Sequence, residues 1–99
     1  MVTRLLTRSS DCFGAIADPT RRAILDLLRT GERTAGDLAG QFAVSRPAVS
    51  RHVRILKRAG LIKERRELRS RVYSVDGRLL AEVDAWLAPY RVSWSTLPP

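Results

Sequence analysis

Apolar residues recur at helical spacing along the first third of the chain. The clearest run predicts a helix over residues 19–30, with Ile24 and Leu28 on its apolar face. Asp18 comes just before this run and is a typical N-cap residue, because its carboxylate can accept hydrogen bonds from the backbone N–H groups of the first turn. A shorter helix is expected upstream, over residues 10–17.

The next two apolar stripes are short and close together, which predicts a helix-turn-helix over residues 34–58. Thr34, with Asp37 three residues later, has the pattern of a capping box at the start of the first helix. After a turn of a few residues, Ser45 and Pro47 mark the start of the second helix, since serine caps a helix and proline is favoured in its first turn.

The second of these helices has two different faces. Val53 and Leu56 fall within about 40° of Val49 on a helical wheel, as a buried face requires. The residues of the opposite half are Pro47, Ser50, Arg51, Arg54 and Arg58, with Arg46 at the exposed N-terminal end. A helix with this division packs by one face and presents the other to solvent or to a partner.

The apolar pattern changes from helical to alternating after the helix-turn-helix. The segment LIKERRELRSRVYSV, residues 61–75, predicts two strands joined by a turn near residues 67–70. A hairpin that follows a helix-turn-helix is typical of a wing.

The last predicted helix, residues 77–95, has a continuous apolar and aromatic stripe. Its members are Leu79, Leu80, Val83, Trp86, Leu87 and Tyr90, with Trp94 four residues further on. The aromatic part of the stripe fits either the core of the chain or a dimer interface. Pro89 removes one helical hydrogen bond, so the helix either kinks there or ends near Ala88.

The positive charge is concentrated in one segment. The net charge is +8, and residues 46–71 hold ten of the eighteen Lys and Arg but only two of the ten Asp and Glu, so this segment carries the whole excess. A surface that only has to be soluble mixes its charges, whereas clustering is expected of a protein that binds a polyanion. The alternative is a solvated basic face without a partner.

The basic helix face has the side chains that DNA recognition needs. The guanidinium group matches O6 and N7 of guanine, so Arg46 and Arg51 are candidates for reading bases. Ser50 can hydrogen-bond a base or a phosphate, and Pro47 can contact a thymine methyl group. The candidates for phosphate contacts, or for the minor groove in the wing, are Arg54, Arg58, Arg66, Arg69 and Arg71.

The sequence offers no residues on which to base catalysis, a cofactor or a metal site. One histidine and one cysteine cannot form a four-ligand zinc site within a chain, and no catalytic triad or glycine-rich phosphate loop stands out. His52 is expected to pack or to contact a phosphate, and Cys12 to be a small buried residue rather than an oxidant sensor. We find no apolar run for a membrane span and no signal peptide in MVTRLLTRSS, so we expect a cytoplasmic protein.

Three segments, FGAIADPTRRAILDLL, VSRPAVSRHVRILKRAGLI and RVYSVD, together resemble the ArsR (ArsR/SmtB) family of bacterial winged-helix repressors. A fourth, EVDAWLAPYRVSW, is similar to the subgroup that lacks the usual metal sites. The resemblance implies a winged helix-turn-helix, mainly α with a small β-hairpin, of about five helices plus a two-stranded wing, as one domain over residues 1–99. It also implies a homodimer that represses by occupying an inverted repeat in double-stranded DNA.

The resemblance further implies which residues meet DNA and the second copy. Arg46, Pro47, Ser50 and Arg51 occupy the positions that contact bases in the family. The first and last helices pair across the dimer, and the expected interface residues are Phe13, Leu80, Val83, Trp86, Leu87, Tyr90 and Trp94.

The chain departs from the family in two places. Where metal-sensing members have a Cys-x-Cys motif this chain has AGDLAGQF, and no histidine follows His52, so we expect no metal sensing by the known sites. No effector ligand follows from the sequence. The wing tip usually has glycine, whereas this chain has Leu68; a positive φ would strain leucine, so the sequence leaves the conformation of this turn open.

Two other functions compete with sequence-specific repression. The first is a winged-helix protein-interaction module whose basic face binds an acidic partner. The second is non-specific architectural DNA binding, which is disfavoured because no apolar wedge beyond Leu68 is available to unstack bases.

Overall fold

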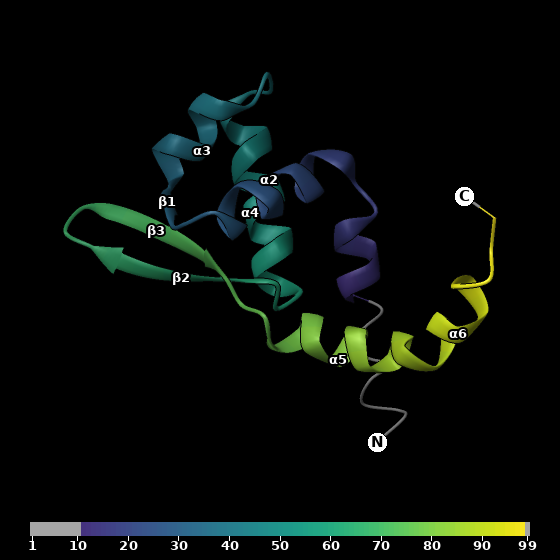
Figure 1. The fold of residues 1–99 in the computed structure, drawn as a ribbon. Helices are drawn as coiled ribbons and strands as arrows, with labels where there is room; N and C mark the ends of the chain where they lie inside the picture. The colour runs from purple at the N-terminus through teal and green to yellow at the C-terminus, as the bar shows by residue number, and fades with distance from the viewer. Residues whose placement is uncertain (1–10, 99) are drawn as a thin grey trace.

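The computed structural model describes residues 11–98 of the chain. A body of helices carries a β-hairpin that projects on one side and a C-terminal segment that projects on the other (Figure 1). In chain order, the elements are a first helix over residues 11–16, α2 (Pro19–Arg29), β1 (Arg33–Thr34), α3 (Ala35–Gln41), α4 (Arg46–Arg58), β2 (Ile62–Glu67), β3 (Ser70–Val75), α5 (Arg78–Leu87), the 3-10 helix η1 (Ala88–Tyr90) and α6 (Arg91–Trp94). The predicted helix start at Ser10 and the opening segment MVTRLLTRSS lie outside the described residues.

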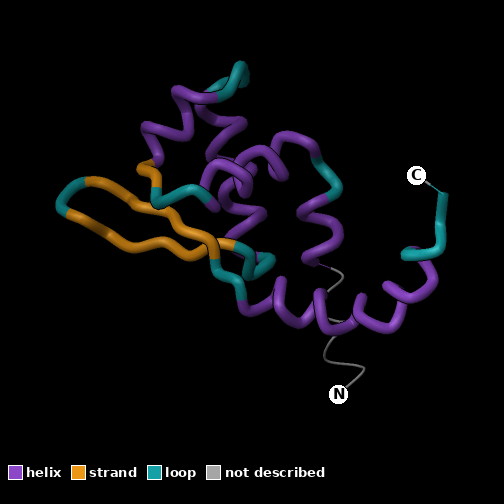
Figure 2. The backbone as a smooth tube through the Cα atoms, in the orientation of Figure 1, coloured by secondary structure: helices purple, strands orange, loops and turns teal. Residues whose placement is uncertain are grey.

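The predicted fold class is confirmed, because the chain is mainly helical and a β-hairpin follows the helix-turn-helix (Figure 2). The sheet has three antiparallel strands in the order β1-β3-β2, so a further strand joins the two strands of the predicted wing. Strand β1 consists of Arg33 and Thr34, which pair with Tyr73 and Val72 of β3. A strand of two residues has no alternation to detect, so periodicity could not predict it.

Side-chain caps begin α2, α3 and α4, as the sequence predicts. Asp18 accepts a backbone hydrogen bond of 2.9 Å at the start of α2. Thr34 and Asp37 form the capping box of α3, and Ser45 caps α4 through its hydroxyl. Each cap of this kind stabilises its helix by about 0.5–2 kcal/mol, so these polar residues determine where the short helices start.

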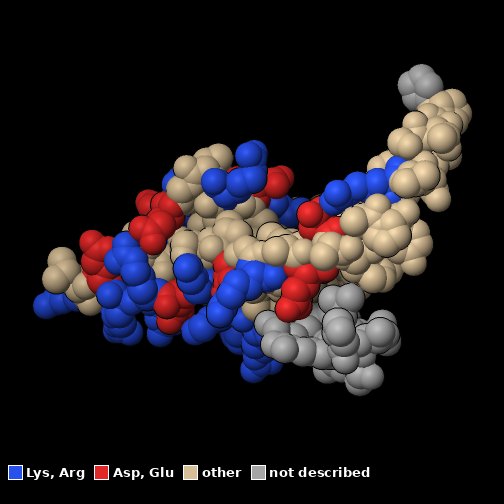
Figure 3. Space-filling view, turned by 60° about the horizontal axis from the view of Figure 1, so that its bottom comes forward, with Lys and Arg blue, Asp and Glu red and all other residues tan. Residues whose placement is uncertain are grey.

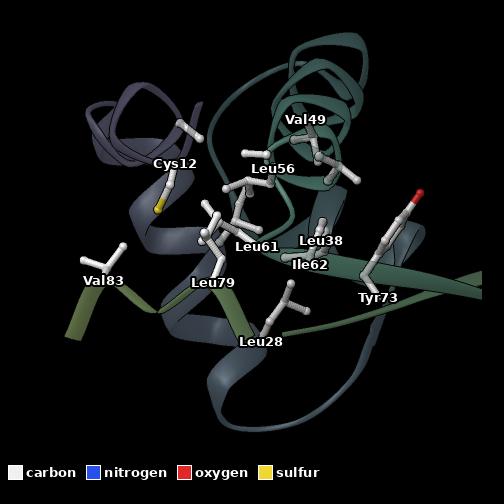
Figure 4. Packing of buried hydrophobic residues seen from close by; sticks show 14 residues of the cluster. Cys12, Leu28, Leu38, Val49, Leu56, Leu61, Ile62, Tyr73, Leu79 and Val83 are labelled. Atoms are coloured by element: carbon white, nitrogen blue, oxygen red, sulfur yellow. The ribbon is translucent and has the colours of Figure 1, made fainter. Parts of the chain in front are cut away.

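A cluster of buried side chains holds the helices and the sheet together (Figure 4). Its largest fully buried members are Ile24, Leu38, Leu56, Leu61, Leu79 and Cys12. From α4 it takes Val49, Val53 and Leu56, the three residues of the predicted apolar face. Burial also raises the pKa of the Cys12 thiol, which disfavours the reactive thiolate and supports its interpretation as a packing residue.

Helix α4 ends in a turn that depends on glycine. Gly60 has a φ of 80°, and its N–H donates to the carbonyl oxygen of Lys57, while the N–H of Leu61 donates to that of Leu56, both at 3.1 Å. These two bonds define a Schellman motif. Because Leu56 and Leu61 are both buried, the motif turns the chain from α4 into β2 with its apolar side chains inward.

The segment predicted as one C-terminal helix is divided at its proline. Helix α5 ends at Leu87, Pro89 lies in the 3-10 helix η1, and α6 follows. Proline lacks the N–H that a continuing α-helix needs, which explains the break. Val83 is only 9% exposed and packs in the core of its own chain, so it offers little surface to the predicted dimer interface. The stripe of α5 turns from core to surface along its length.

The wing turn keeps a positive φ in spite of its leucine. Glu67 and Ser70 pair across β2 and β3, which leaves Leu68 and Arg69 as a two-residue turn. Leu68 has a φ of 55°. The hairpin register is kept, and the leucine takes the conformation that glycine or asparagine usually supplies, which settles the turn that the sequence left open.

Substitution of two glycines by alanine distinguishes the effect of backbone strain from that of helix propensity. We expect Gly60→Ala to destabilise the protein by about 1 kcal/mol or more, because alanine is strained at positive φ. Gly40→Ala should instead stabilise it by up to about 1 kcal/mol, because Gly40 lies in α3 and an added Cβ meets nothing within 4 Å. Urea denaturation at fixed protein concentration measures both. If both substitutions change the free energy of unfolding in the same direction, this explanation of how α4 ends is contradicted.

Candidate nucleic-acid interface

The exposed face of α4 is held in position from its opposite side. Val49 and Val53 lie in the core, and the helix packs against α2, α3 and β2. At its start, the Ser45 hydroxyl accepts a hydrogen bond of 3.2 Å from the backbone N–H of Ala48, and Pro47 restricts the first turn. The first turn of α4 therefore has little conformational entropy left to lose on binding.

The exposed half of α4 is cationic and unneutralised. All of its candidate residues are exposed: Arg46, Pro47, Ser50, Arg51, Arg54 and Arg58. Among residues 11–98, no carboxylate lies within salt-bridge distance of these four arginines. Four cations on one short helix face repel one another, and an external anion would relieve that repulsion.

The wing adds a second group of cations. Arg66 of β2 and Arg71 of β3 are directly opposite each other in the ladder, and both are exposed. Like charges at opposed positions destabilise a hairpin. Arg69 is exposed in the turn between them. The pairing of Arg66 with Arg71 therefore lowers the stability of the hairpin. An anion bound between the two arginines would offset this cost.

Other cations of the same segment are neutralised within the chain. Arg65 donates hydrogen bonds of 3.3 and 2.9 Å to the carboxylate of Glu32 and a further one to Glu67, and these bonds raise the pKa of its guanidinium. Lys57 Nζ lies 3.5 Å from Glu64 Oε2. These pairs join β2 to the loop before β1 and to α4. They therefore hold the wing against the body, whereas the arginines of the exposed α4 face, together with Arg66 and Arg69 of the wing, have no carboxylate within salt-bridge distance among residues 11–98.

A small hollow of about 160 Å³ connects the two groups of cations, with Arg54 of α4 and Arg71 of β3 both in its lining. Figure 3 shows Lys and Arg gathered over the hairpin and the adjoining side of the body, while the C-terminal segment is almost free of them. We call the exposed, candidate cations of α4 and the wing the basic surface: Arg46, Arg51, Arg54, Arg58, Arg66, Arg69 and Arg71.

Arg21 of α2 connects the first helix with α4. Its Nε and Nη2 donate to the carbonyl oxygens of Ala15 and Gly14, at 2.6 and 3.2 Å, and its Nη1 lies 3.2 Å from Nδ1 of His52. Arginine can only donate, so Nδ1 of His52 accepts and the ring proton is on Nε2. The Asp18 carboxylate is 3.9 Å from the same nitrogen, too far for a hydrogen bond, so Arg21 determines the tautomer.

This connection lies beside a candidate base-reading residue. His52 packs against α2, one of its two expected roles, and it directly follows Arg51 in α4. An open hollow of about 460 Å³ is lined by both residues and by Asp18 and Arg21. The hydrogen bond from the backbone N–H of Arg21 lowers the pKa of the Asp18 carboxyl. The sequence did not point to Arg21, because a contact between residues 31 positions apart leaves no local pattern.

A second exposed surface is apolar. The rings of Phe13 and Trp86 are 5.9 Å apart between centroids, those of Trp86 and Tyr90 are 5.3 Å apart, and Trp86 is 43% exposed. This exposure excludes the core of the chain as the place of the aromatic stripe. Leu87 is half-buried against the core. We call the exposed group the aromatic face: Phe13, Leu80, Trp86, Tyr90 and Trp94.

Comparison with known proteins identifies the family. A helix-turn-helix domain family matches residues 16–65. The transcriptional repressor SdpR of Bacillus subtilis is 44% identical over 78 residues, which are 79% of this chain and 87% of that protein. A crystal structure of an ArsR family transcriptional regulator is similar with a TM-score of 0.79 and 32% identity, covering 93% of this chain and 95% of that one. The chain belongs to the ArsR family.

The ArsR family consists of DNA-binding transcriptional regulators and not of enzymes. A further similar structure is that of a homodimeric winged helix-turn-helix DNA-binding domain from Mycobacterium bovis, a possible ArsR-family regulator, with a TM-score of 0.74 and 29% identity over 97% of this chain and 87% of that one. In this ArsR-family chain, α3 and α4 are the helix-turn-helix, and β2 and β3 are the wing.

Residues 11–98 contain no group of three or more His, Cys, Asp and Glu that could hold a metal ion. Nor does any helix of that part have the length and apolar character needed to cross a bilayer.

The bridge through Arg21 can be tested by its effect on stability. Arg21→Ala should destabilise the protein by about 1–3 kcal/mol, because it removes charge-assisted bonds to two backbone carbonyls and leaves His52 without its donor. The matched control is Arg29→Ala, an exposed arginine of the same helix, which should change stability by less than about 0.5 kcal/mol. Urea denaturation compares them, and equal effects would show that the bridge contributes nothing.

Proposed function

We propose that this ArsR-family protein is a sequence-specific DNA-binding repressor that occupies an inverted-repeat operator as a homodimer. The observation that carries the proposal is the unpaired cationic face of α4, held rigidly next to a cationic wing. Double-stranded DNA fits it by shape, since the major groove admits one helix and the backbones on either side supply phosphates. Relatives such as SdpR are named transcriptional repressors, which supports repression rather than activation.

In this proposal, the first half of α4 reads bases. Arg46 and Arg51 donate to guanine O6 and N7, Ser50 hydrogen-bonds a base or a phosphate, and Pro47 contacts a thymine methyl group. All four are exposed near the capped N-terminus, where the backbone is most restrained. Their reach and rigidity support base readout, because discrimination needs donors in fixed positions.

The remaining cations of the basic surface bind the sugar-phosphate backbone. Arg54 and Arg58 lie further along α4, and Arg66, Arg69 and Arg71 belong to the wing. Neutralising phosphates releases condensed counterions, which gives affinity without sequence preference. A phosphate bound between the opposed residues Arg66 and Arg71 should contribute most to affinity, because it also reduces the repulsion between them.

The aromatic face, together with the half-buried Leu87, is proposed as the dimer interface. It exposes large aromatic side chains in one group, a composition typical of interface centres. The chain measures 47 × 34 × 21 Å with a radius of gyration of 15.3 Å, whereas about 13 Å is usual for a compact chain of this size. A second copy that covers the projecting C-terminal segment would account for this shape. We place the protein in the cytoplasm, where the proposed operator is.

Base reading by Arg51 has a distinct experimental signature. Arg51→Ala should weaken binding to the operator by about 1–3 kcal/mol and relax the base preference at one position of each half-site. Selection of bound fragments from random DNA supplies the operator, and gel-shift titration then compares operator with random duplex. Equal losses on both would contradict the base-reading role.

The matched control is a wing cation. Arg69→Ala should weaken operator and random DNA almost equally and make the dependence of log affinity on log salt shallower by about one. If the unsubstituted protein shows no preference among duplexes, and binds acidic polypeptides instead, the protein-interaction module replaces the repressor as the function.

The dimer interface is tested by removing its central ring. Trp86→Ala should weaken dimerisation by about 2 kcal/mol or more, because it removes the ring that contacts both Phe13 and Tyr90. Val44→Ala, at an exposed apolar residue in the turn before α4, should leave dimerisation unchanged. Sedimentation equilibrium measures both dissociation constants. A monomeric unsubstituted protein, or an unchanged Trp86 variant, would rule out this interface.

A further inference from the structure

The tip of the wing combines two unfavourable features in one residue. Leu68 is 96% exposed, the highest value among the exposed large hydrophobic residues. It also has a φ of 55°, and no other residue except glycine has a positive φ within residues 11–98. A leucine in this region is strained, and its exposed side chain gains nothing from the core.

The hairpin does not need leucine at this position. The strand pairing extends to Glu67 and Ser70, so the turn closes through backbone geometry that glycine or asparagine adopts at lower cost. A strained residue persists where its surroundings or its function require it, and the side chain here points away from its own fold. A contact outside the chain would account for a leucine at this position.

The chemistry around the tip indicates what that contact is. Leu68 lies between Glu67, whose carboxylate is paired with Arg65, and Arg69, and the two strands that meet at the tip carry Arg66 and Arg71. The free charge around the apolar apex is therefore cationic. A partner for this arrangement has an apolar recess between two rows of anions. The minor groove of double-stranded DNA has this structure: it is about 6 Å wide, its walls are sugars, and phosphates line both edges.

We propose that Leu68 is a DNA-contacting residue that enters the minor groove and packs against its sugar walls, while the neighbouring wing arginines bind the phosphates at the edges. The inference rests on the proposed function and adds an apolar contact to it. Residues that enter the minor groove in other DNA-binding proteins include such apolar side chains beside arginine or lysine. The strain in the turn is then the cost of placing an apolar side chain at the point that reaches furthest from the body.

The test uses variants that separate strain from contact. Leu68→Gly relieves the backbone strain and removes the side chain, and Leu68→Met keeps an apolar side chain of similar reach. We expect Leu68→Gly to unfold at an unchanged or higher urea concentration and yet to bind the operator about tenfold more weakly, as the loss of an apolar contact predicts. Leu68→Met should retain most of the affinity.

Salt dependence distinguishes this contact from a phosphate contact. The loss caused by Leu68→Gly should be the same factor at every salt concentration, whereas the loss caused by Arg69→Ala should diminish as salt rises. Hydroxyl radicals attack the sugars from the minor groove, so Leu68→Gly should also lose protection at the operator edges that Leu68→Met keeps.

Each outcome decides a separate question. If the unsubstituted protein selects no operator, the proposed function fails and the role of Leu68 fails with it. If the unsubstituted protein selects an operator but Leu68→Gly binds it equally well, with the same footprint, only the minor-groove contact is refuted. A Leu68→Met variant as weak as Leu68→Gly would also refute it, because apolar character would then not be what the tip requires.

Discussion

The burial of one face of α4 is the constraint on which the rest of the structure depends. Val49, Val53 and Leu56 enter the core, and this burial fixes the rotation of the helix about its own axis. The opposite face then has no freedom to turn inward, so its arginines point to solvent whatever binds them. The cap at Ser45 fixes where the helix starts, and the Schellman motif at Gly60 fixes where it ends. The functional surface is thus a consequence of core packing.

Electrostatic pairing divides the cations of the same segment into two groups. Arg65 is used to attach the wing to the loop before β1, through Glu32, and Lys57 is close to Glu64. Within residues 11–98, the four arginines of the exposed α4 face have no such carboxylate, and Arg71 of the wing is close to the Tyr73 hydroxyl and the Glu64 carboxylate. Surface ion pairs of this kind contribute little to stability, so their value lies in orientation. A wing held at a fixed angle to α4 lets both groups of free cations meet one rigid duplex.

Local patterns in the sequence predicted those features that depend on neighbours in the chain. The caps, the buried face of α4 and the wing turn involve residues only a few positions apart, and hydrophobic periodicity or capping chemistry reveals them. Contacts between distant segments were missed, namely the two-residue strand β1, the bridge from Arg21 to His52 and the burial of Val83 in its own core. The helical stripe that contains Val83 was predicted correctly. The stripe alone does not indicate where its core-facing residues end and its exposed aromatic residues begin.

The basic surface and the aromatic face lie on different elements, and this separation has a physical reason. Charges that bind phosphates need water and mobile counterions around them, whereas aromatic side chains gain from losing contact with water. A chain of 99 residues has too little core to satisfy both demands within one compact body. It places the cations on α4 and the wing, and the rings on the first helix and α5 to α6, with the core between them (Figure 1). A dimer built through the aromatic face leaves both basic surfaces uncovered, so association and DNA binding do not compete for the same residues.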